Sequence, residues 1–525
     1  MRRDVTSPTG ARGGLALAAI LGIGLLVRLA LSGLSTTSNM DPDAAHFLNI
    51  ARCFANGQGF SNPAAWPAWI QPAALPMPET FKEPAYPWLI SHLARPLSDW
   101  FRAGQWLSLL AGAALPWVTW QLAQRRGLDH ATSLLAAALV AASPLALVQS
   151  VRVMVDASFA LVVTSMFLLA APRSEGGHAL IDDLAAGALF GLAFLFRAQT
   201  LLLLLPLLAL MIEARALKAA LPRIALAIVV AVVVASPLWL RNLALFHTPM
   251  YSDVVAYGLW PYVDHLTFSH GLEHPPAVVP FVLAHVPQVL AHMVHSFAAF
   301  FVHSLPEMVI GHALWMLPVA AGVLLSLSGA RRWLFAYLYL GVTLIFISAV
   351  HWDARYFTSS VPLWALFTAL GAASLARPVA NLQLAGPVRG AHVMGAALAL
   401  VLVLQVMVAR RELRQFAPPE IAAAQHEAAF LDAHLAKDEA VLAVTTSYWS
   451  WFSDRPSVHL VIADEARFDG AMGRLKVRWA ALPTSRLAEF AARYPGGALP
   501  RSLVFDHADP ARDVTVFAVR TGGAL

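Results

Sequence analysis

The chain has few charged residues and almost no cysteine. Of its 525 residues, 13% are charged and 58% are hydrophobic, whereas soluble globular chains carry about 25% charged residues. This composition excludes a soluble globular protein and indicates a polytopic membrane protein. The single cysteine, Cys53, excludes an internal disulfide.

Several sequence motifs are also missing. The chain has no Gly-rich nucleotide loop, no ligand spacing typical of a metal site, and no basic surface interleaved with aromatic residues for nucleic acid. We therefore expect no cofactor, do not favour a divalent metal, and exclude nucleic acid as a partner. Membrane topology explains most of the formal net charge of +5.

Apolar runs long enough to cross a bilayer, roughly 17–25 residues, recur along the chain. We assign eleven spans, near 14–34, 104–122, 131–149, 152–171, 184–197, 199–214, 222–240, 308–328, 333–350, 358–376 and 391–409. The first run lacks a signal-peptide cleavage site, so we expect it to be an anchor. A further apolar stretch at 277–303 carries four histidines, and we expect it to lie on the outer interface instead of spanning.

Basic residues set the expected orientation. With the N-terminus in the cytoplasm, eleven spans place most loop arginines and lysines on the cytoplasmic side: Arg125, Arg126, Arg173, Arg215, Lys218, Arg223, Arg331, Arg332, Arg377 and Arg389. The exceptions follow the last span: Arg410, Arg411 and Arg414. We expect a multi-pass plasma (inner) membrane protein whose loops at about 35–103 and 241–307 lie outside the cytoplasm.

The composition turns polar after the last span. A helical pattern at 420–436 precedes strand-like runs at 440–445, 458–462 and 514–519, with another helical pattern near 485–493. The expected architecture is an all-α transmembrane domain over residues 1–410, with about 11 transmembrane helices. A small extracytoplasmic α/β domain over 415–525 follows it.

Two carboxylates open a helix just beyond the first span. Asp41 followed by Pro42 predicts a helix N-cap and first helical residue. From that start, Asp43 shares a stripe with Phe47 and Ile50, at helical offsets of four and seven. A carboxylate aimed at the apolar face makes Asp43 the first candidate for a catalytic base.

Other charged residues fall at the predicted outer ends of spans, where they are costly unless they have a role. Asp156 lies four residues after Arg152, so the two could form a local helix ion pair. Arg241 could snorkel to the interface, and Arg355 could pair with Asp353. Arg197 lies between two apolar runs with no acidic residue nearby, so it needs a partner from another span or an anionic ligand.

The order of these patches resembles polytopic glycosyltransferases with the GT-C fold, the relatives of protein O-mannosyltransferases and lipid A aminoarabinose transferases. The resemblance spans about residues 15–375. It is carried by Pro42-Asp-Ala-Ala-His-Phe47, Asn56-Gly-Gln-Gly59, Lys82-Glu-Pro-Ala-Tyr-Pro-Trp-Leu89, Leu192-Ala-Phe-Leu-Phe-Arg197, Pro237-Leu-Trp-Leu-Arg-Asn242 and Arg355-Tyr356. The chain departs from the family pattern at Ala44, where many relatives have Glu or Ser, and at Phe47, where they have Tyr.

The resemblance implies transfer of a sugar from a polyprenyl-phosphate donor to a lipid, glycan or protein acceptor outside the cytoplasm. It implies Asp43 as general base and Asp156 as a second catalytic carboxylate. The residues it implies for the donor phosphate are Lys82, Arg197, Arg241 and Arg355. Further substrate contacts are expected from Asp41, Glu83, Tyr86, Asn242 and Tyr356.

Two other functions also fit a chain with charges among apolar helices. A transporter or flippase of a lipid-linked glycan usually has internal repeats and a site near the bilayer midplane, whereas these charges gather at one boundary. A non-catalytic envelope-assembly protein would use the C-terminal domain as its interaction surface. Convergence of Asp43 and Arg197 on one cavity would favour the enzyme.

Overall fold

The computed structural model describes residues 8–65, 73–173, 179–213, 215, 217–252, 262, 278–350, 352–380, 390–462 and 464–520. The chain divides into two compact units. The helical unit comprises residues 1–35, 105–250 and 291–415. The mixed unit comprises residues 36–104, 251–290 and 416–525.

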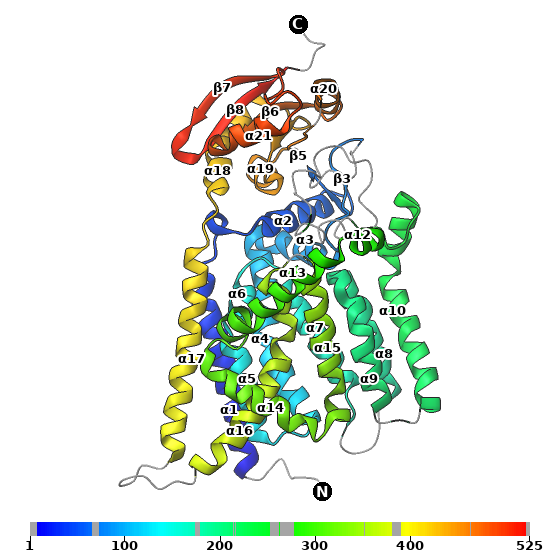
Figure 1. Ribbon diagram of the computed structural model, residues 1–525, viewed down its shortest axis with the longest axis vertical. Coiled ribbons are helices and arrows are strands. Elements are labelled where there is room, and N and C mark those ends of the chain that lie inside the picture. Colours follow the sequence, from blue (N-terminus) through cyan, green and yellow to red (C-terminus); the bar gives the residue numbers. More distant parts are fainter. Residues whose placement is uncertain are drawn as a thin grey trace. The chain divides into compact units, whose positions relative to one another are not determined.

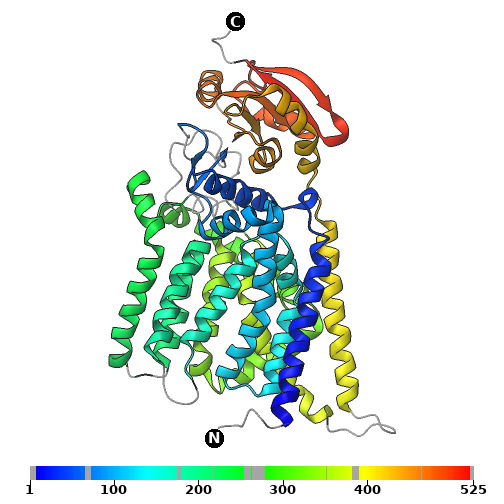
Figure 2. The same ribbon diagram turned by 180° about the vertical axis from the view of Figure 1, so that it is seen from behind.

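The helical unit is built from apolar helices, most of which run side by side (Figure 1 and Figure 2). In chain order they are α1 (Pro8–Ser32), α4 (Trp100–Arg125), α5 (His130–Ala142), α6 (Pro144–Val151), α7 (Asp156–Ala170), α8 (Leu180–Phe196), α9 (Leu204–Glu213), α10 (Leu217–Phe246), α13 (Val286–Ala299), α14 (Met316–Leu327), α15 (Ala330–Ala349), α16 (Val361–Ala380) and α17 (Gly390–Gln415). The 3-10 helices η2 (Ala198–Leu203), η5 (Ala313–Trp315) and η6 (Ala354–Ser360) and the π-helix η4 (Phe300–Val309) complete it.

A helix, or a pair of helices, occupies each of the eleven predicted spans. Five described helices are long and apolar enough to cross a membrane, and the bent pair of α5 and α6 gives a sixth. One of the five is Val286–Val309, which overlaps the stretch that the sequence predicts to lie on the interface. The mostly helical architecture is confirmed, and the number of spans stays a prediction.

The predicted third span is broken, with α5 and α6 meeting at an angle of 52°. Ser143 is the N-cap of α6, and Pro144 is its first residue. Proline has no backbone N–H, so it cannot continue the i to i−4 hydrogen bonds of α5. Arg28 of α1 is fully buried and donates to the carbonyl of Ala141, 3.2 Å away, and to Ser150 Oγ at the same distance. The Arg28 guanidinium therefore donates to a backbone carbonyl at the end of α5 that the break leaves without a helical donor.

Close helix packing in the same unit depends on small residues. A Cβ added to Gly187 of α8 would lie 2.3 Å from the carbonyl oxygen of Ala227 on α10. At Gly191, one turn further, the added Cβ would lie 2.5 Å from the carbonyl oxygen of Ala231. Such small-residue contacts let transmembrane helices approach closely, and here they set the distance between α8 and α10.

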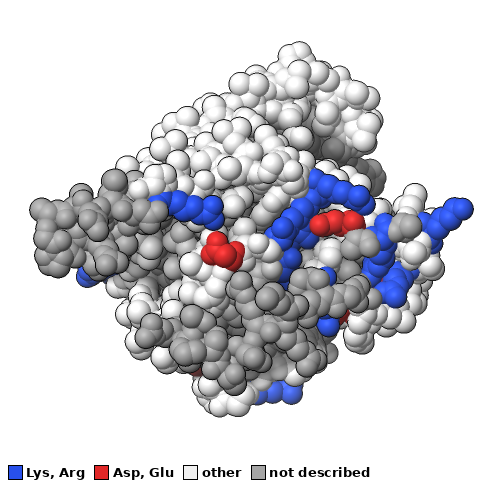
Figure 3. Space-filling model, turned by 90° about the horizontal axis from the view of Figure 1, so that it is seen from below, with Lys and Arg blue, Asp and Glu red and all other residues white. Residues whose placement is uncertain are grey.

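Ion pairs join the loops at one end of the helical unit. Buried Asp183 at the start of α8 pairs with Arg215 at 2.9 Å and with Arg223 at 3.0 Å. Its neighbour Asp182 pairs with Arg173 at 2.8 Å. Figure 3, the view from below, shows Lys and Arg side chains around smaller acidic patches. Buried charge at this end is thus paired, as its low-dielectric surroundings require.

The mixed unit combines a small sheet with helices. Its helices are η1 (Thr37–Asn39), α2 (Pro42–Ala55), α3 (Ala85–Leu97), α12 (Val278–Ala284), α18 (Pro419–His434), α19 (Thr446–Ser453), α20 (Glu465–Arg474), η7 (Thr484–Arg486), α21 (Leu487–Arg493) and η8 (Pro510–Arg512). Its strands are β1 (Ser61–Asn62), β2 (Ala64–Ala65), β3 (Met77–Pro78), β4 (Ala440–Ala443), β5 (Ser457–His459), β6 (Val477–Leu482), β7 (Leu503–Asp509) and β8 (Val514–Val519).

The main sheet has the order β2-β5-β4-β6-β8-β7. The strands β4, β5 and β8 and the helices α18 and α21 fall where the sequence predicts them. The edge strand β2 comes from the first predicted outer loop and pairs in parallel with β5, Ala64 opposite Ser457. The first loop and the C-terminal segment therefore share one sheet.

Candidate functional site

The helix that carries the predicted base begins as expected. Asp41 is the N-cap of α2, and Pro42 is its first residue. The Asp41 carboxylate accepts a hydrogen bond from the backbone N–H of Asp43 at 2.9 Å. The capping role predicted for Asp41 is therefore confirmed. The cap uses only the backbone N–H of Asp43, so the Asp43 carboxylate can make other contacts.

Asp43 and Lys82 form an ion pair in the mixed unit. Lys82 Nζ lies 2.8 Å from Asp43 Oδ1, and the two side chains are 14% and 19% exposed. The ammonium also lies 4.5 Å from the ring of Phe81 and 5.5 Å from that of Phe47. The predicted base and one predicted phosphate ligand are therefore direct neighbours, and ligands can reach both from solvent.

A buried polar cluster lies behind this pair. Glu79 Oε2 lies 2.9 Å from His46 Nε2 and accepts a hydrogen bond from Asn62 Nδ2 at 2.8 Å. Glu79 Oε1 accepts from the backbone N–H groups of Phe81 at 2.7 Å and Lys82 at 2.9 Å. Burial alone would raise the pKa of Glu79, but His46, Lys82 and Asn62 together lower it to about 2. The glutamate is thus ionised and holds the backbone of Lys82.

Helix α19 of the C-terminal segment packs against α2. The hydroxyl of Tyr448 donates to the carbonyl of Met40 at 2.8 Å, one residue before the cap. Asn49 donates to the carbonyl of Ser447 at 3.0 Å. At the far end of α2, the guanidinium of Arg52 lies over the ring of Trp451, 3.6 Å from its centroid. These contacts fix α2, and with it Asp43, on the C-terminal segment.

The other predicted carboxylate lies in the helical unit. Asp156, the first residue of α7, is 2% exposed, and its Oδ1 accepts from Nη2 of Arg197 at 2.6 Å. Arg197 is the residue at which α8 ends. The sequence predicts that Arg197 needs a partner from elsewhere, and this contact between separate helices confirms it.

Tyr356 lies beside the predicted arginines. Its ring is 5.3 Å from the guanidinium of Arg197 and 5.5 Å from that of Arg355, distances typical of cation–π contacts. Arg355 Nε pairs with Asp353 Oδ2 at 2.8 Å, which is the local pairing that the sequence allowed. Two cations, each paired with a carboxylate, thus lie near one ring.

The remaining predicted residues have local contacts. Arg241 donates to the side chain of Asn242 at 2.9 Å, near the end of α10. In the mixed unit, Tyr86 is fully buried and its hydroxyl donates to the carbonyl of Gly104 at 3.0 Å. Glu83 is half-buried beside Lys82.

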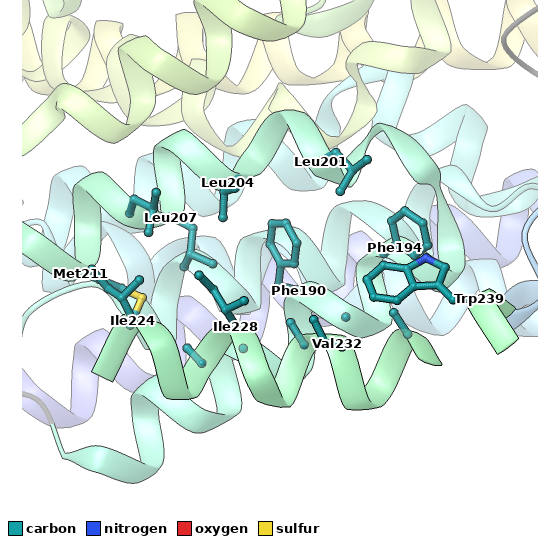
Figure 4. Close-up of a pocket in the computed structure, with 16 residues that line it drawn as sticks. Phe190, Phe194, Leu201, Leu204, Leu207, Met211, Ile224, Ile228, Val232 and Trp239 are labelled. Atoms are coloured by element: carbon teal, nitrogen blue, oxygen red, sulfur yellow. The ribbon is translucent and has the colours of Figure 1, made fainter. Parts of the chain in front are cut away.

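An apolar groove of about 170 Å³ lies between α8, η2, α9 and α10. All of the side chains that line it are apolar. Phe194 and Trp239 lie at one end and Met211 and Ile224 at the other (Figure 4). Phe194 precedes Arg197 by three residues. The groove thus begins close, along the chain, to the predicted phosphate ligand.

Sequence reasoning missed His46, Asn62 and Glu79 as a cluster. Each is an ordinary polar residue in its own segment, and only the hairpin of β1 and β3 brings Asn62 and Glu79 together. The available signal was the placement of His46 one helical turn after Asp43. Among the described residues, no group of three or more His, Cys, Asp or Glu side chains is arranged to hold a metal ion.

Comparisons with known proteins agree with this architecture. Residues 78–240 match the family model described as dolichyl-phosphate-mannose-protein mannosyltransferase. A search of curated proteins gives no match.

Two solved structures share the fold. ArnT from Cupriavidus metallidurans bound to undecaprenyl phosphate gives a TM-score of 0.58 at 15% identity, covering 95% of this chain and 97% of that chain. The oligosaccharyltransferase AglB from Archaeoglobus fulgidus, in complex with an inhibitory peptide and a dolichol-phosphate, gives 0.63 at 15% identity, covering 96% of this chain and 74% of that chain. The chain therefore has the GT-C fold of polytopic membrane glycosyltransferases, and the resemblance seen in its sequence is confirmed.

Proposed function

We propose that this protein transfers one sugar from a polyprenyl-phosphate donor to a hydroxyl of a lipid, glycan or protein acceptor, outside the cytoplasm of a plasma (inner) membrane. The observation that carries the proposal is the Asp43–Lys82 pair at the start of α2, in a chain with the GT-C fold. The pair supplies a base and a cation side by side. Both are needed when a hydroxyl attacks a sugar held by a phosphate.

The reaction is a single displacement. Asp43 takes the proton of the acceptor hydroxyl, whose oxygen forms a bond to the anomeric carbon of the sugar. The bond between that carbon and the phosphate oxygen breaks, and polyprenyl phosphate leaves with the electron pair. General-base assistance of this kind contributes about 10²–10⁴-fold to a rate. The anomeric configuration is expected to invert.

Charge that develops on the leaving phosphate needs cations. Lys82 and Arg197 are the first candidates and Arg241 and Arg355 are further ones, because arginine and lysine bind phosphate through charge-assisted hydrogen bonds. Asp156 orients Arg197 through their ion pair, and Asp41, Glu83, Tyr86, Asn242 and Tyr356 complete the proposed substrate contacts. No metal or other cofactor takes part in the proposed reaction.

The lipid tail of the donor has a candidate site in the helical unit. The groove beside α10 has only apolar lining, as an isoprenoid chain requires. The ArnT and AglB structures named above were solved with undecaprenyl phosphate and a dolichol-phosphate, respectively, which supports a lipid-phosphate donor here. The proposal includes eleven spans and an extracytoplasmic C-terminal α/β segment.

The test is an assay of purified protein with a panel of polyprenyl-phosphate sugars, scoring the release of polyprenyl phosphate. Asp43→Asn should abolish release while expression and folding stay intact. The matched control is Asp99→Asn, which changes a carboxylate of the same loop that caps a backbone N–H at Arg102. A chelator should leave the rate unchanged. Normal turnover by Asp43→Asn would overturn the assignment of the base.

A further inference from the structure

The ion pair of Asp43 and Lys82 has two properties that a purely structural pair does not need. Both side chains are partly exposed, at 19% and 14%, whereas His46 and Glu79 behind them are each 3% exposed. The lysine is also the proposed ligand of the donor phosphate. One ammonium therefore has two anionic partners, one within the protein and one on the substrate.

The backbone N–H of Lys82 is held by a hydrogen bond, while its side chain is partly exposed. Its N–H donates to Glu79 Oε1 at 2.9 Å, and buried His46 and Asn62 hold Glu79. The flexible four-carbon stem ends in a compact point charge. A change of partner thus requires rotation of one side chain and no movement of the loop.

Several ionisable groups on α2 and on the elements packed against it have identified contacts. Asp41 accepts from the N–H of Asp43, and Tyr86 of α3 donates to Gly104. Tyr448 of α19 donates to Met40. At the opposite end of α2, Arg52 lies 3.6 Å from Asp454. Lys82, in contrast, holds its ammonium 2.8 Å from the carboxylate of Asp43.

We propose that Lys82 pairs with Asp43 in the donor-free protein and leaves it to pair with the phosphate of the lipid-linked donor when the donor binds. We call this exchangeable ion pair the latch. An ammonium within hydrogen-bond distance weakens a carboxylate as a base, since it stabilises the ionised form. When Lys82 moves to the phosphate, Asp43 loses that cation and becomes a stronger base. The donor must then bind before the acceptor can be deprotonated. This inference rests on the proposed function and specifies the order of its substrates.

The experiment is an infrared pH titration of the protonated carboxyl band of Asp43. The band is assigned by subtracting the spectrum of Asp43→Asn, and each titration is run with and without saturating undecaprenyl phosphate. Because this lipid carries no sugar, no turnover is needed. The midpoint in wild-type protein should rise by about one pH unit or more when the lipid binds. In Lys82→Met it should already be raised without lipid, and Lys82→Arg should keep the wild-type value.

The possible outcomes are distinct. Binding of the lipid phosphate with an unchanged midpoint overturns the latch and leaves the proposed function intact. A midpoint in lipid-free Lys82→Met equal to that of wild type also overturns it. If a direct binding measurement shows no affinity for undecaprenyl phosphate, the proposed function fails, and the latch fails with it. An unchanged midpoint in the wild-type titration overturns the latch even where the Lys82 variants fold poorly.

Discussion

Asp156 and Arg197 form an ion pair between two helices of the helical unit, with 2.6 Å between Oδ1 and Nη2. Asp156 begins α7 and Arg197 ends α8, so the pair joins helix ends that are 41 residues apart in the chain. A buried pair of this kind contributes little net stability, because desolvation offsets the attraction. A buried ion pair at the proposed phosphate site therefore points to a role in the reaction more than in stability.

The first prediction separates stability from function at this pair. Arg197→Met removes the cation that pairs with the buried Asp156 carboxylate, so the free energy of unfolding should fall by about 3–5 kcal/mol. The double variant Asp156→Leu with Arg197→Met removes both charges and should recover most of that loss. Sugar transfer should stay low in both variants, because the cation is missing. Recovery of activity along with stability would show that the pair is only structural.

The sequence predicted features that depend on local rules. The cap at Asp41 followed from the Asp-Pro pair, and the need of Arg197 for a distant partner followed from its apolar surroundings. Features that depend on pairing across the chain were missed. The strand β2 is two residues long and pairs with β5, nearly 400 residues away, and no periodicity marks so short a strand. The cluster around Glu79 was missed for the same reason.

The break between α5 and α6 shows a second limit of prediction from sequence. Residues 131–149 are mostly apolar, so the sequence predicts one span there. Pro144 signals a kink or a break, but its size depends on what replaces the lost backbone bonds. Buried Arg28 supplies that replacement from another helix. A side chain 113 residues away in the chain therefore decides the local geometry.

The second prediction concerns Glu79 and pH. Its pKa of about 2 lies below the unfolded value of 4.5, so the ionised glutamate stabilises the folded state. This contribution is fully present above the unfolded pKa and is lost as the pH falls through the folded pKa. Glu79→Gln should therefore lower the free energy of unfolding at pH 7 by on the order of 3 kcal/mol. The difference from wild type should shrink below about pH 4.5.

Glu420 provides the control for that experiment, since burial raises its pKa. Its sign is opposite: relative to Glu420→Gln, wild-type protein should lose stability as the pH rises through the Glu420 pKa. Thermal unfolding in detergent between about pH 2.5 and pH 8 measures both variants. Parallel pH profiles for the two substitutions would contradict the role given to the cluster around Glu79.

The third prediction tests the apolar groove with two neighbouring residues of α10. Val232 lines the groove and Val233 does not, and both are exposed in the structure. Val232→Trp should fill part of the groove and raise KM for a long-chain donor, while a donor with a short isoprenoid tail should be affected much less. Val233→Trp, with the same change in size, should leave both KM values unchanged. Equal effects of the two variants would assign the lipid tail to another surface.

The last prediction concerns the contact between α19 and the start of α2. Tyr448 and Tyr494 are both buried in the mixed unit, and each hydroxyl donates to a backbone carbonyl at 2.8 Å. The acceptor of Tyr448 is Met40, three residues before Asp43, whereas the acceptor of Tyr494 is Val461. Replacing either tyrosine by phenylalanine leaves one buried carbonyl without its donor, at a cost of about 1–3 kcal/mol.

The two substitutions should therefore have similar effects on stability and different effects on transfer. Tyr448→Phe loosens the chain that positions Asp43, and small displacements of a catalytic group can reduce kcat by about 10-fold or more. Tyr494→Phe should retain the wild-type kcat, because its contact lies within the C-terminal segment. Unfolding curves and initial rates on the same preparations provide the comparison. Equal kcat values in both variants would show that the hydrogen bond from Tyr448 to Met40 does not position the proposed base, Asp43.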